Sequence, residues 1–201
     1  MTGPPLLYLI RHGETAWSLS GQHTGRSEVP LTAKGEAMAQ ELSTRLQDLR
    51  FAQVLTSPRL RARETCRLAG LAARAEVEPQ LAEWDYGDYE GLRSTQIHAL
   101  RPDWDIWTDG CPGGETAPAV SARADRLIAQ LCMLHGNIAL FSHGHFGRVL
   151  AARWLGLAAC EGRHFSIDPC SVGVLGVADE APHPRLILLW NASSGVLRRG
   201  P

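Results

Sequence analysis

A chain of 201 residues, 44% hydrophobic and 20% charged, has the length and composition of one globular domain. Its formal net charge of −1 provides no basic field that would recruit nucleic acid or an anionic membrane. The cysteines form no CxxC pair and only Leu6–Ile10 is apolar before Arg11, which argues against a zinc knuckle, a disulfide framework and a signal peptide. We therefore expect a cytoplasmic protein with reduced thiols.

Apolar runs divide the chain into alternating strands and helices. The continuous run Leu6–Ile10 is typical of a parallel strand buried on both faces, and Thr32 is expected to cap the following helix. The other expected elements are strands over 52–56, 75–77, 138–141, 172–177 and 186–190 and helices over 59–71, 120–134 and 148–155. This alternation predicts a three-layer α/β/α sandwich with a mostly parallel central sheet, forming one domain over residues 1–201.

Residues 84–118 interrupt the pattern with a segment rich in Gly, Trp, Asp and Pro. We expect a long excursion that caps the active site and contains a short helix near residues 95–100. Its aromatic residues and a glycine turn are expected to shape the mouth of the pocket: Trp84, Tyr86, Trp104, Trp107 and Gly113–Gly114.

Three of the expected strands end directly in polar segments, namely Arg11–Thr15, Ser57–Arg61 and Ser142–His145. Because the carboxyl ends of parallel strands meet at one edge of the sheet, we expect these segments to converge. The resulting set contains two histidines, at least two arginines, and glycines such as Gly144 that let backbone approach a ligand. Such a site suits a doubly charged phosphoryl group.

Each residue type has a role in phosphoryl transfer. Arg11 and Arg61 can each offer a fork of donors to phosphate oxygens. His12 can attack phosphorus while neutral, provided that a backbone carbonyl holds its other ring nitrogen, and His143 would stabilise the transferring group. Glu83 is expected to protonate the leaving alcohol. Because Glu83 must be protonated and His12 neutral, we expect a bell-shaped pH profile with its maximum in mildly acidic to neutral solution.

Other polar residues allow two interpretations. Glu14 either braces the first loop or touches the substrate, and His145 is either a structural partner of the site or a substrate contact. The remaining histidines are expected to be non-catalytic: His23, His98, His135, His164 and His183.

These segments also resemble the signature of the histidine phosphatase (phosphoglycerate mutase-like) superfamily. The matching segments cover nearly the whole chain: Arg11–Thr15, Gly21–Gly25, Pro30–Thr32, Thr56–Thr65, Glu83–Gly91, Pro112–Thr116 and Ser142–His145. The resemblance implies that His12 is the phosphorylated nucleophile and Glu83 the proton donor, with no metal or cofactor. Arg11, Arg61 and His143 would complete the phosphate pocket.

The same resemblance implies a set of substrate-binding residues. Thr24 and Gly25 match a substrate-contacting turn, and Tyr86 lies in the stretch that borders the leaving group. Ser18 departs from the family pattern, because many relatives carry an asparagine there that helps to hold the phosphate. A serine is expected to leave that contact to water or backbone. Several segments resemble bacterial acid phosphatases and sedoheptulose or fructose bisphosphatases in particular.

We therefore expect a metal-independent hydrolase of small phosphomonoesters, sugar phosphates above all, acting through a phosphohistidine. One alternative is a phosphoglycerate mutase, although the Trp-Asp-Tyr segment after Glu83 offers no basic residue for a substrate carboxylate. Others are a catalytically inactive phospholigand-binding module and a metal hydrolase built on His12, His143 and His145. The expected partner is a small phosphorylated metabolite, not nucleic acid or membrane. A homodimer is one option for the assembly, and the sequence leaves the physiological substrate open.

Overall fold

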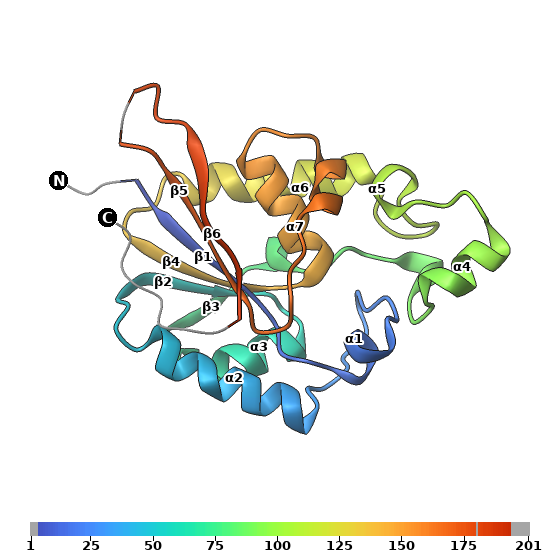
Figure 1. The fold of residues 1–201 in the computed structure, drawn as a ribbon, viewed down its shortest axis with the longest axis horizontal. Helices are drawn as coiled ribbons and strands as arrows, with labels where there is room; N and C mark the ends of the chain where they lie inside the picture. The colour runs from blue at the N-terminus through green and yellow to red at the C-terminus, as the bar shows by residue number, and fades with distance from the viewer. Residues whose placement is uncertain (1–3, 180, 194–201) are drawn as a thin grey trace.

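A six-stranded sheet organises the computed structural model, which describes residues 4–179 and 181–193 (Figure 1). Its strands are β1 (Leu6–Arg11), β2 (Phe51–Thr56), β3 (Ala75–Val77), β4 (Asn137–Ser142), β5 (Val172–Val177) and β6 (Arg185–Ala192). They lie in the order β3-β2-β4-β1-β5-β6. The strands from β3 to β1 run parallel, whereas β5 pairs antiparallel with β1 and β6 antiparallel with β5. The prediction of a mostly parallel sheet is confirmed.

Helices cover both faces of this sheet (Figure 1). The long ones are α2 (Ala33–Leu46) and α3 (Leu60–Leu68) on one face, and α6 (Ala117–Leu131) and α7 (Gly144–Trp154) on the other. Shorter elements are α1 (Ala16–Ser20), α4 (Ser94–Leu100), α5 (Ile106–Asp109) and the 3-10 turns η1 (Ala72–Arg74), η2 (Pro79–Leu81), η3 (Gly87–Tyr89) and η4 (Ala159–His164). Within the described part of the chain, no helix is both long and apolar enough to span a bilayer.

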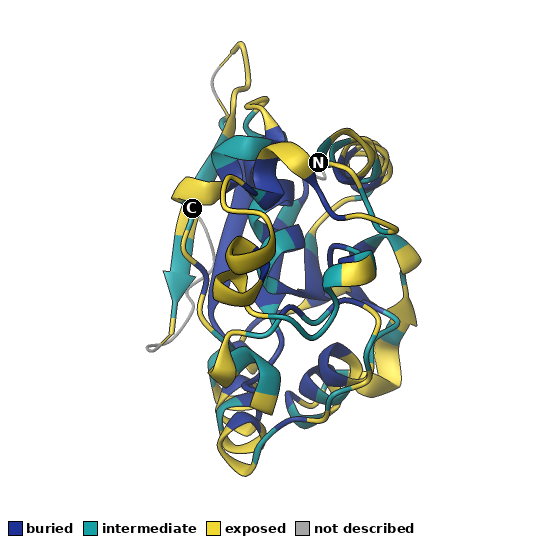
Figure 2. Ribbon diagram, turned by 90° about the vertical axis from the view of Figure 1, so that its right-hand side faces the viewer, coloured by how far each residue is buried: buried dark blue, intermediate teal, exposed yellow. Residues whose placement is uncertain are grey.

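Side chains of β1 alternate between two separate cores. Leu7 and Leu9 pack in the cluster that includes α6 and α7, whereas Tyr8 and Ile10 pack in the cluster that includes α2 and α3. Figure 2 shows the inner strands of the sheet in the buried colour and exposed residues on the outer sides of the helices, whereas the edge strands β3 and β6 are intermediate or exposed. The three-layer architecture is thereby confirmed. The single domain over 1–201 stays a prediction, because residues 1–3, 180 and 194–201 lie outside the described part.

Strand register brings the three polar segments together. β1 pairs with β4 up to Arg11 and Ser142, and β2 pairs with β4 up to Thr56 and Phe141. The backbone N–H of His12, the first residue after β1, donates to the carbonyl of Ser142 at 2.9 Å. The strands therefore end side by side, as the apolar runs predicted.

The loop after β1 is fixed against the start of α2. Thr32 caps α2 as expected, its hydroxyl accepting from the N–H of Gly35 at 3.0 Å. Gly35 has no room for a side chain, since a Cβ there would lie 2.1 Å from the carbonyl oxygen of Glu14. The Glu14 carboxylate accepts hydrogen bonds from Thr32 at 2.9 Å and Lys34 at 3.2 Å. Glu14 thus braces the loop.

The excursion contains α4 where the short helix was expected, but its tryptophans do not shape the pocket mouth. Trp84, Trp104 and Trp107 are buried in the core. The indole N–H groups of Trp84 and Trp104 donate to the carbonyls of Glu115 and Gly110 at 3.0 and 2.8 Å. Large aromatic rings stabilise the excursion best when they are buried, so they form its core and not its rim.

The Gly113–Gly114 turn likewise packs inside the excursion. A Cβ on Gly114 would lie 2.2 Å from the carbonyl oxygen of Asp85, so the turn requires glycine to approach that backbone. The expectation that this turn lines the pocket is wrong, because it closes the excursion onto itself.

Candidate active site

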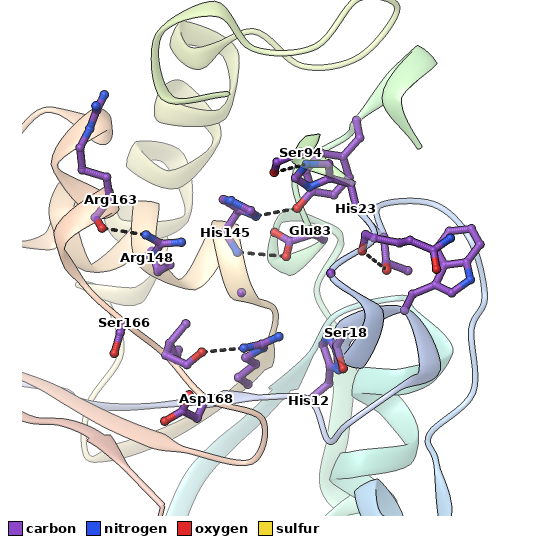
Figure 3. Close-up of a pocket in the computed structure, with 18 of the residues that line it drawn as sticks. His12, Ser18, His23, Glu83, Ser94, His145, Arg148, Arg163, Ser166 and Asp168 are labelled. Atoms are coloured by element: carbon purple, nitrogen blue, oxygen red, sulfur yellow. Dashed lines mark hydrogen bonds between the residues drawn. The ribbon is translucent and has the colours of Figure 1, made fainter. Parts of the chain in front are cut away.

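A cavity of about 470 Å³ opens where β1 and β4 end (Figure 3). Seven residues predicted for the site line it: Arg11, His12, Ser18, Thr24, Glu83, Tyr86 and Gly144. The other predicted residues, Gly25, Arg61 and His143, are buried next to these.

The imidazole of His12 is fixed in the orientation that a nucleophile requires. Its Nδ1 lies 2.7 Å from the carbonyl oxygen of Gly13. Because a carbonyl only accepts, Nδ1 carries the proton and Nε2 keeps its lone pair. Burial lowers the pKa of His12 well below 6.5, and the positive charges of Arg61 and Arg11 lower it further. The ring is therefore neutral at neutral pH.

His143 follows β4 as His12 follows β1, and their ring centroids lie 5.2 Å apart. The Ser57 hydroxyl accepts from the backbone N–H of Arg59 at 3.2 Å and lies 2.7 Å from Nε2 of His143, to which it can donate its own proton. With Ser57 as donor, the proton of the His143 ring sits on Nδ1. Burial lowers the pKa of His143 well below 6.5, so the ring is neutral and offers one N–H.

Arg61 does not present the expected fork of donors. Its Nη1 donates to the carbonyl of Ser27 at 3.0 Å, and its Nη2 to those of Thr24 and Gly25 at 2.7 and 3.2 Å. The loop carbonyls compete with phosphate for the guanidinium, and Nε is its one nitrogen without a partner among the described residues. Arg61 thus holds the loop with three of its five N–H groups, while its Nε–H has no partner.

Three buried N–H groups next to His12 have no acceptor within the part of the chain that the structure describes. They are Nε of Arg11, Nε of Arg61 and Nδ1 of His143. Buried donors are normally paired, since each unpaired one costs about 1–3 kcal/mol. Three such donors around one neutral imidazole favour a ligand rich in acceptor oxygens, as a phosphoryl group is.

Glu83 lies at the N-terminus of α7, where backbone N–H groups lack partners within the helix. Its Oε1 accepts from the N–H of Trp84 at 2.9 Å and of Phe146 at 2.7 Å, and its Oε2 from the N–H of His145 at 3.0 Å (Figure 3). With about two lone pairs on each oxygen, Oε1 is saturated and Oε2 keeps one free. Oε2 is therefore the atom that can hold a proton.

Comparison with known proteins agrees with this geometry. The model of the histidine phosphatase superfamily (branch 1) matches residues 7–191. This chain belongs to the histidine phosphatase superfamily. The sequence-based expectations that the chain belongs to this family, has its fold and is an enzyme are thereby confirmed.

Two curated relatives and one solved structure illustrate the membership. An acid phosphatase of Mycobacterium tuberculosis is 45% identical over 175 residues, covering 85% of each chain. A sedoheptulose 1,7-bisphosphatase of Saccharomyces cerevisiae is 39% identical over 187 residues, covering 76% of this chain and 68% of its own. The solved structure of a Mycobacterium tuberculosis open reading frame superposes with a TM-score of 0.85 at 40% identity, covering 93% of this chain and 97% of its own.

Ser18, where the sequence was expected to depart from the family pattern, has a local structural role. The Ser18 hydroxyl accepts from the N–H of Thr15 at 2.9 Å and lies 3.0 Å from the Thr15 carbonyl. Ser18 lines the cavity, but its hydroxyl caps the start of α1. The expectation that it leaves the phosphate contact to other groups is consistent with this arrangement.

The loop of Thr24 and Gly25 contributes only its first residue to the cavity wall. Gly25 is buried, and its N–H donates to the Glu90 carboxylate, whose Oε2 lies 2.9 Å away. The same carboxylate accepts from the N–H of Ser27 at 2.9 Å. Gly25 therefore supports the turn that was expected to contact the substrate. In this geometry Gly25 itself does not face the cavity.

Tyr86 and two histidines form one wall of the cavity. The Tyr86 hydroxyl lies 2.8 Å from Nδ1 of His145, and the His23 ring packs 4.7 Å from the Tyr86 ring, centroid to centroid. His145 is thus both a structural partner of Tyr86 and a residue of the cavity. His23 and His164, which the sequence analysis expected to be non-catalytic, line the cavity as well.

Sequence reasoning missed most of the remaining lining. The missed residues come from α1, the loop that follows it, α4, α7 and the segment around η4: Trp17, Gly21, Gln22, Ser94, Arg148, Arg163, Ser166, Ile167 and Asp168. One signal was available, because Arg148 follows Gly144 by four residues on a helix and so shares its face.

Each of the three histidines of the metal-site alternative has one ring nitrogen hydrogen-bonded to a neighbour. His12 bonds to Gly13, His143 to Ser57 and His145 to Tyr86. The residues that the structure describes contain no group of three or more histidine, cysteine, aspartate or glutamate side chains arranged to hold a metal ion.

Proposed function

We propose that this protein hydrolyses phosphate monoesters of small metabolites, sugar phosphates included, through a phosphohistidine at His12 and without a metal ion. The observation that carries the proposal is the neutral His12 ring beside three unpaired buried N–H donors. The names of the relatives, an acid phosphatase and a sugar bisphosphatase, support the same substrate class.

In the first step, Nε2 of His12 attacks phosphorus and the bond from phosphorus to the ester oxygen breaks. The departing oxygen takes the proton held on Oε2 of Glu83, so a neutral alcohol leaves. Nε of Arg11, Nε of Arg61 and Nδ1 of His143 donate to the phosphoryl oxygens, whose charge they stabilise during transfer.

In the second step, water attacks phosphorus and the bond to Nε2 of His12 breaks. Glu83, now a carboxylate, takes the proton of the water on Oε2, which restores both groups and releases inorganic phosphate. One carboxyl thus serves first as acid and then as base, and its three backbone hydrogen bonds keep it in one position for both steps.

The test measures phosphate release from a panel of phosphorylated metabolites. We expect turnover by the wild-type protein and a loss of about 10³-fold or more in His12→Ala, because no other imidazole has a free lone pair in the same place. Unchanged turnover in that variant would refute the mechanism. Isomerisation of phosphoglycerate faster than phosphate release would identify a mutase instead.

We also propose a cytoplasmic location, supported by five cysteines that are all free thiols. The proposed partner is the phosphorylated metabolite alone, without nucleic acid or membrane. A homodimer stays an expectation, which sedimentation of the purified protein would test.

A further inference from the structure

An ion pair outside the cavity lining holds the segment that carries Glu83. Arg123 lies on α6 and Glu115 precedes that helix, with Nη2 of the arginine 2.6 Å from Oε2 of the glutamate. Both side chains are largely buried, at 12% and 21% exposed, and neither lines the cavity. Any effect of this pair on the reaction must therefore pass through the residues that it holds.

Arg123 fixes the backbone at Glu83 and just before it. Its Nη1 donates to the carbonyls of Gln80 and Ala82, both at 2.7 Å, and its Nη2 to that of Glu83 at 3.3 Å. Nε and Nη2 also donate to the Glu115 carboxylate, at 2.7 and 2.6 Å. All five N–H groups of the guanidinium are thus used, three on the segment and two on the carboxylate.

Glu115 fixes the backbone that follows Glu83. Its Oε2 accepts from the N–H of Asp85 at 3.0 Å, and its own N–H donates to the Asp85 carbonyl at 2.9 Å. Its carbonyl accepts from the indole of Trp84 at 3.0 Å. Glu83 is therefore held from both sides in the chain, by the arginine up to residue 83 and by the glutamate at residues 84 and 85.

Arg123 also contacts the helix start that receives the Glu83 carboxylate. Its guanidinium lies over the ring of Phe146, 4.1 Å from the centroid, where a cation is attracted by the aromatic face. The N–H of Phe146 donates to Oε1 of Glu83 at 2.7 Å. One side chain thus connects the backbone that carries Glu83 with a group that orients its carboxylate.

We propose that Arg123 and Glu115 are positioning residues, which set where Oε2 of Glu83 lies relative to the leaving oxygen. A catalytic group misplaced by about 1 Å can cost about 10²-fold in rate. The loss of either residue should therefore impair mainly the step in which Glu83 gives up its proton. This inference rests on the proposed hydrolase function, and the experiment separates the two.

The experiment compares an alkyl phosphate, whose leaving oxygen needs a proton, with p-nitrophenyl phosphate, whose leaving group departs without one. In Arg123→Met we expect kcat/KM to fall by about tenfold to 10²-fold for the alkyl phosphate and by less than about threefold for p-nitrophenyl phosphate. Arg123→Lys should recover part of the loss, because an ammonium keeps the charge and some of the donors.

A double variant shows whether the effect passes through the acid. In Glu83→Gln no proton is left to place, so adding Arg123→Met should lower kcat/KM for the alkyl phosphate by less than about threefold further. Full additivity of the two losses would overturn the inference. A loss in Arg123→Met that is equal for both substrates would overturn it as well.

Glu115→Gln and the Lys variant decide the matter if Arg123→Met fails to fold, as circular dichroism would show. The amide keeps an acceptor for the N–H of Asp85 but removes the charge, so we expect a smaller loss with the same dependence on substrate. Arg153→Met is the matched control. It breaks the ion pair with Asp125 at 2.8 Å, also between α7 and α6 but outside the cavity, and should keep both values of kcat/KM within about twofold.

The wild-type protein tests the underlying function separately. Phosphate release from either substrate supports the hydrolase function whatever the variants do, and its absence from both contradicts that function.

Discussion

Residues around His12 are held by the central sheet, whereas residues around Arg148 are held by helix turns and loops. His12 and His143 directly follow strands, and both are buried. Arg148 instead depends on carbonyls of η4, a segment brought back to α7 from later in the chain. We call the first region the reaction half of the cavity and the second the leaving-group half.

The difference separates chemistry from specificity. In the reaction half, backbone groups fix the ring of His12 and the carboxylate of Glu83, so the geometry follows from the fold. In the leaving-group half, exposed residues such as Arg163 and Ser166 line the cavity wall. Because they lie outside the sheet, their substitution should leave the sheet intact. One scaffold can thus keep its reaction while the accepted alcohol changes.

Among the changes that compare the two halves, Glu83→Gln is expected to have the largest effect, and it separates the two steps of the reaction. Alkyl phosphates need a proton on the leaving oxygen, so we expect kcat/KM to fall by about 10²–10³-fold. The first step with p-nitrophenyl phosphate needs no such proton, and its kcat/KM should fall by less than about tenfold. Glu76→Gln, an equal loss of charge at an exposed position, is the control. Equal losses for both substrates would contradict the role of Glu83 as acid.

A smaller effect is expected from Gly144→Ala, which narrows the junction of the two halves. The new methyl would lie 3.5 Å from Nε of Arg11 and 3.7 Å from Oε2 of Glu83. We expect kcat/KM to fall about tenfold, while the free energy of unfolding does not decrease, since alanine favours helix over glycine.

Gly147→Ala is the control for that measurement. It adds the same methyl further along α7, against Leu9 and Ile167 at 3.4 Å. Similar losses of kcat/KM in both variants would show that the methyl at residue 144 does not act through Arg11 and Glu83.

The smallest effect concerns stability at acidic pH in the leaving-group half. Burial lowers the pKa of His23 to about 4, below the ordinary 6.5 of the unfolded chain. Protonation of His23 therefore favours unfolding. The stability that the neutral ring provides is complete above about pH 6.5 and is lost as the pH falls toward 4. Between pH 7 and pH 5, we expect protonation of His23 to lower the free energy of unfolding by about 2 kcal/mol.

Urea unfolding at both pH values measures that loss. His23→Phe keeps a ring that can pack on Tyr86 and removes the titrating group, so its stability should depend less on pH than that of the wild-type protein by about this amount. His135→Gln, at an exposed position, should behave like the wild-type protein. If the free energy of unfolding depended on pH identically in all three proteins, burial of His23 would not be the cause of the loss at acidic pH.

The sequence was most informative where a signal is local. Continuous apolar runs predicted the strands, and the polar segments at their ends predicted where His12, Ser57 and His143 meet. Helices α1 and α5 were not predicted, since five and four residues are too few to show a helical period.

The sequence was least informative where a side chain has competing partners. The two terminal nitrogens of Arg61 donate to the carbonyls of Thr24, Gly25 and Ser27. No sequence pattern predicts these hydrogen bonds. The guanidinium of Arg148 is oriented by Gly162 and Arg163, fourteen and fifteen residues further along. Such contacts depend on tertiary structure, so the leaving-group half could not be predicted in detail.

The most direct test of the proposed mechanism traps the intermediate. Glu83→Gln is mixed with p-nitrophenyl phosphate, quenched in base and digested, and the peptides are analysed by mass spectrometry. Because the first step needs no acid with this substrate while the second lacks its base, we expect phosphate to accumulate on His12. Release of p-nitrophenol with no phosphate on His12 at any time would contradict the account.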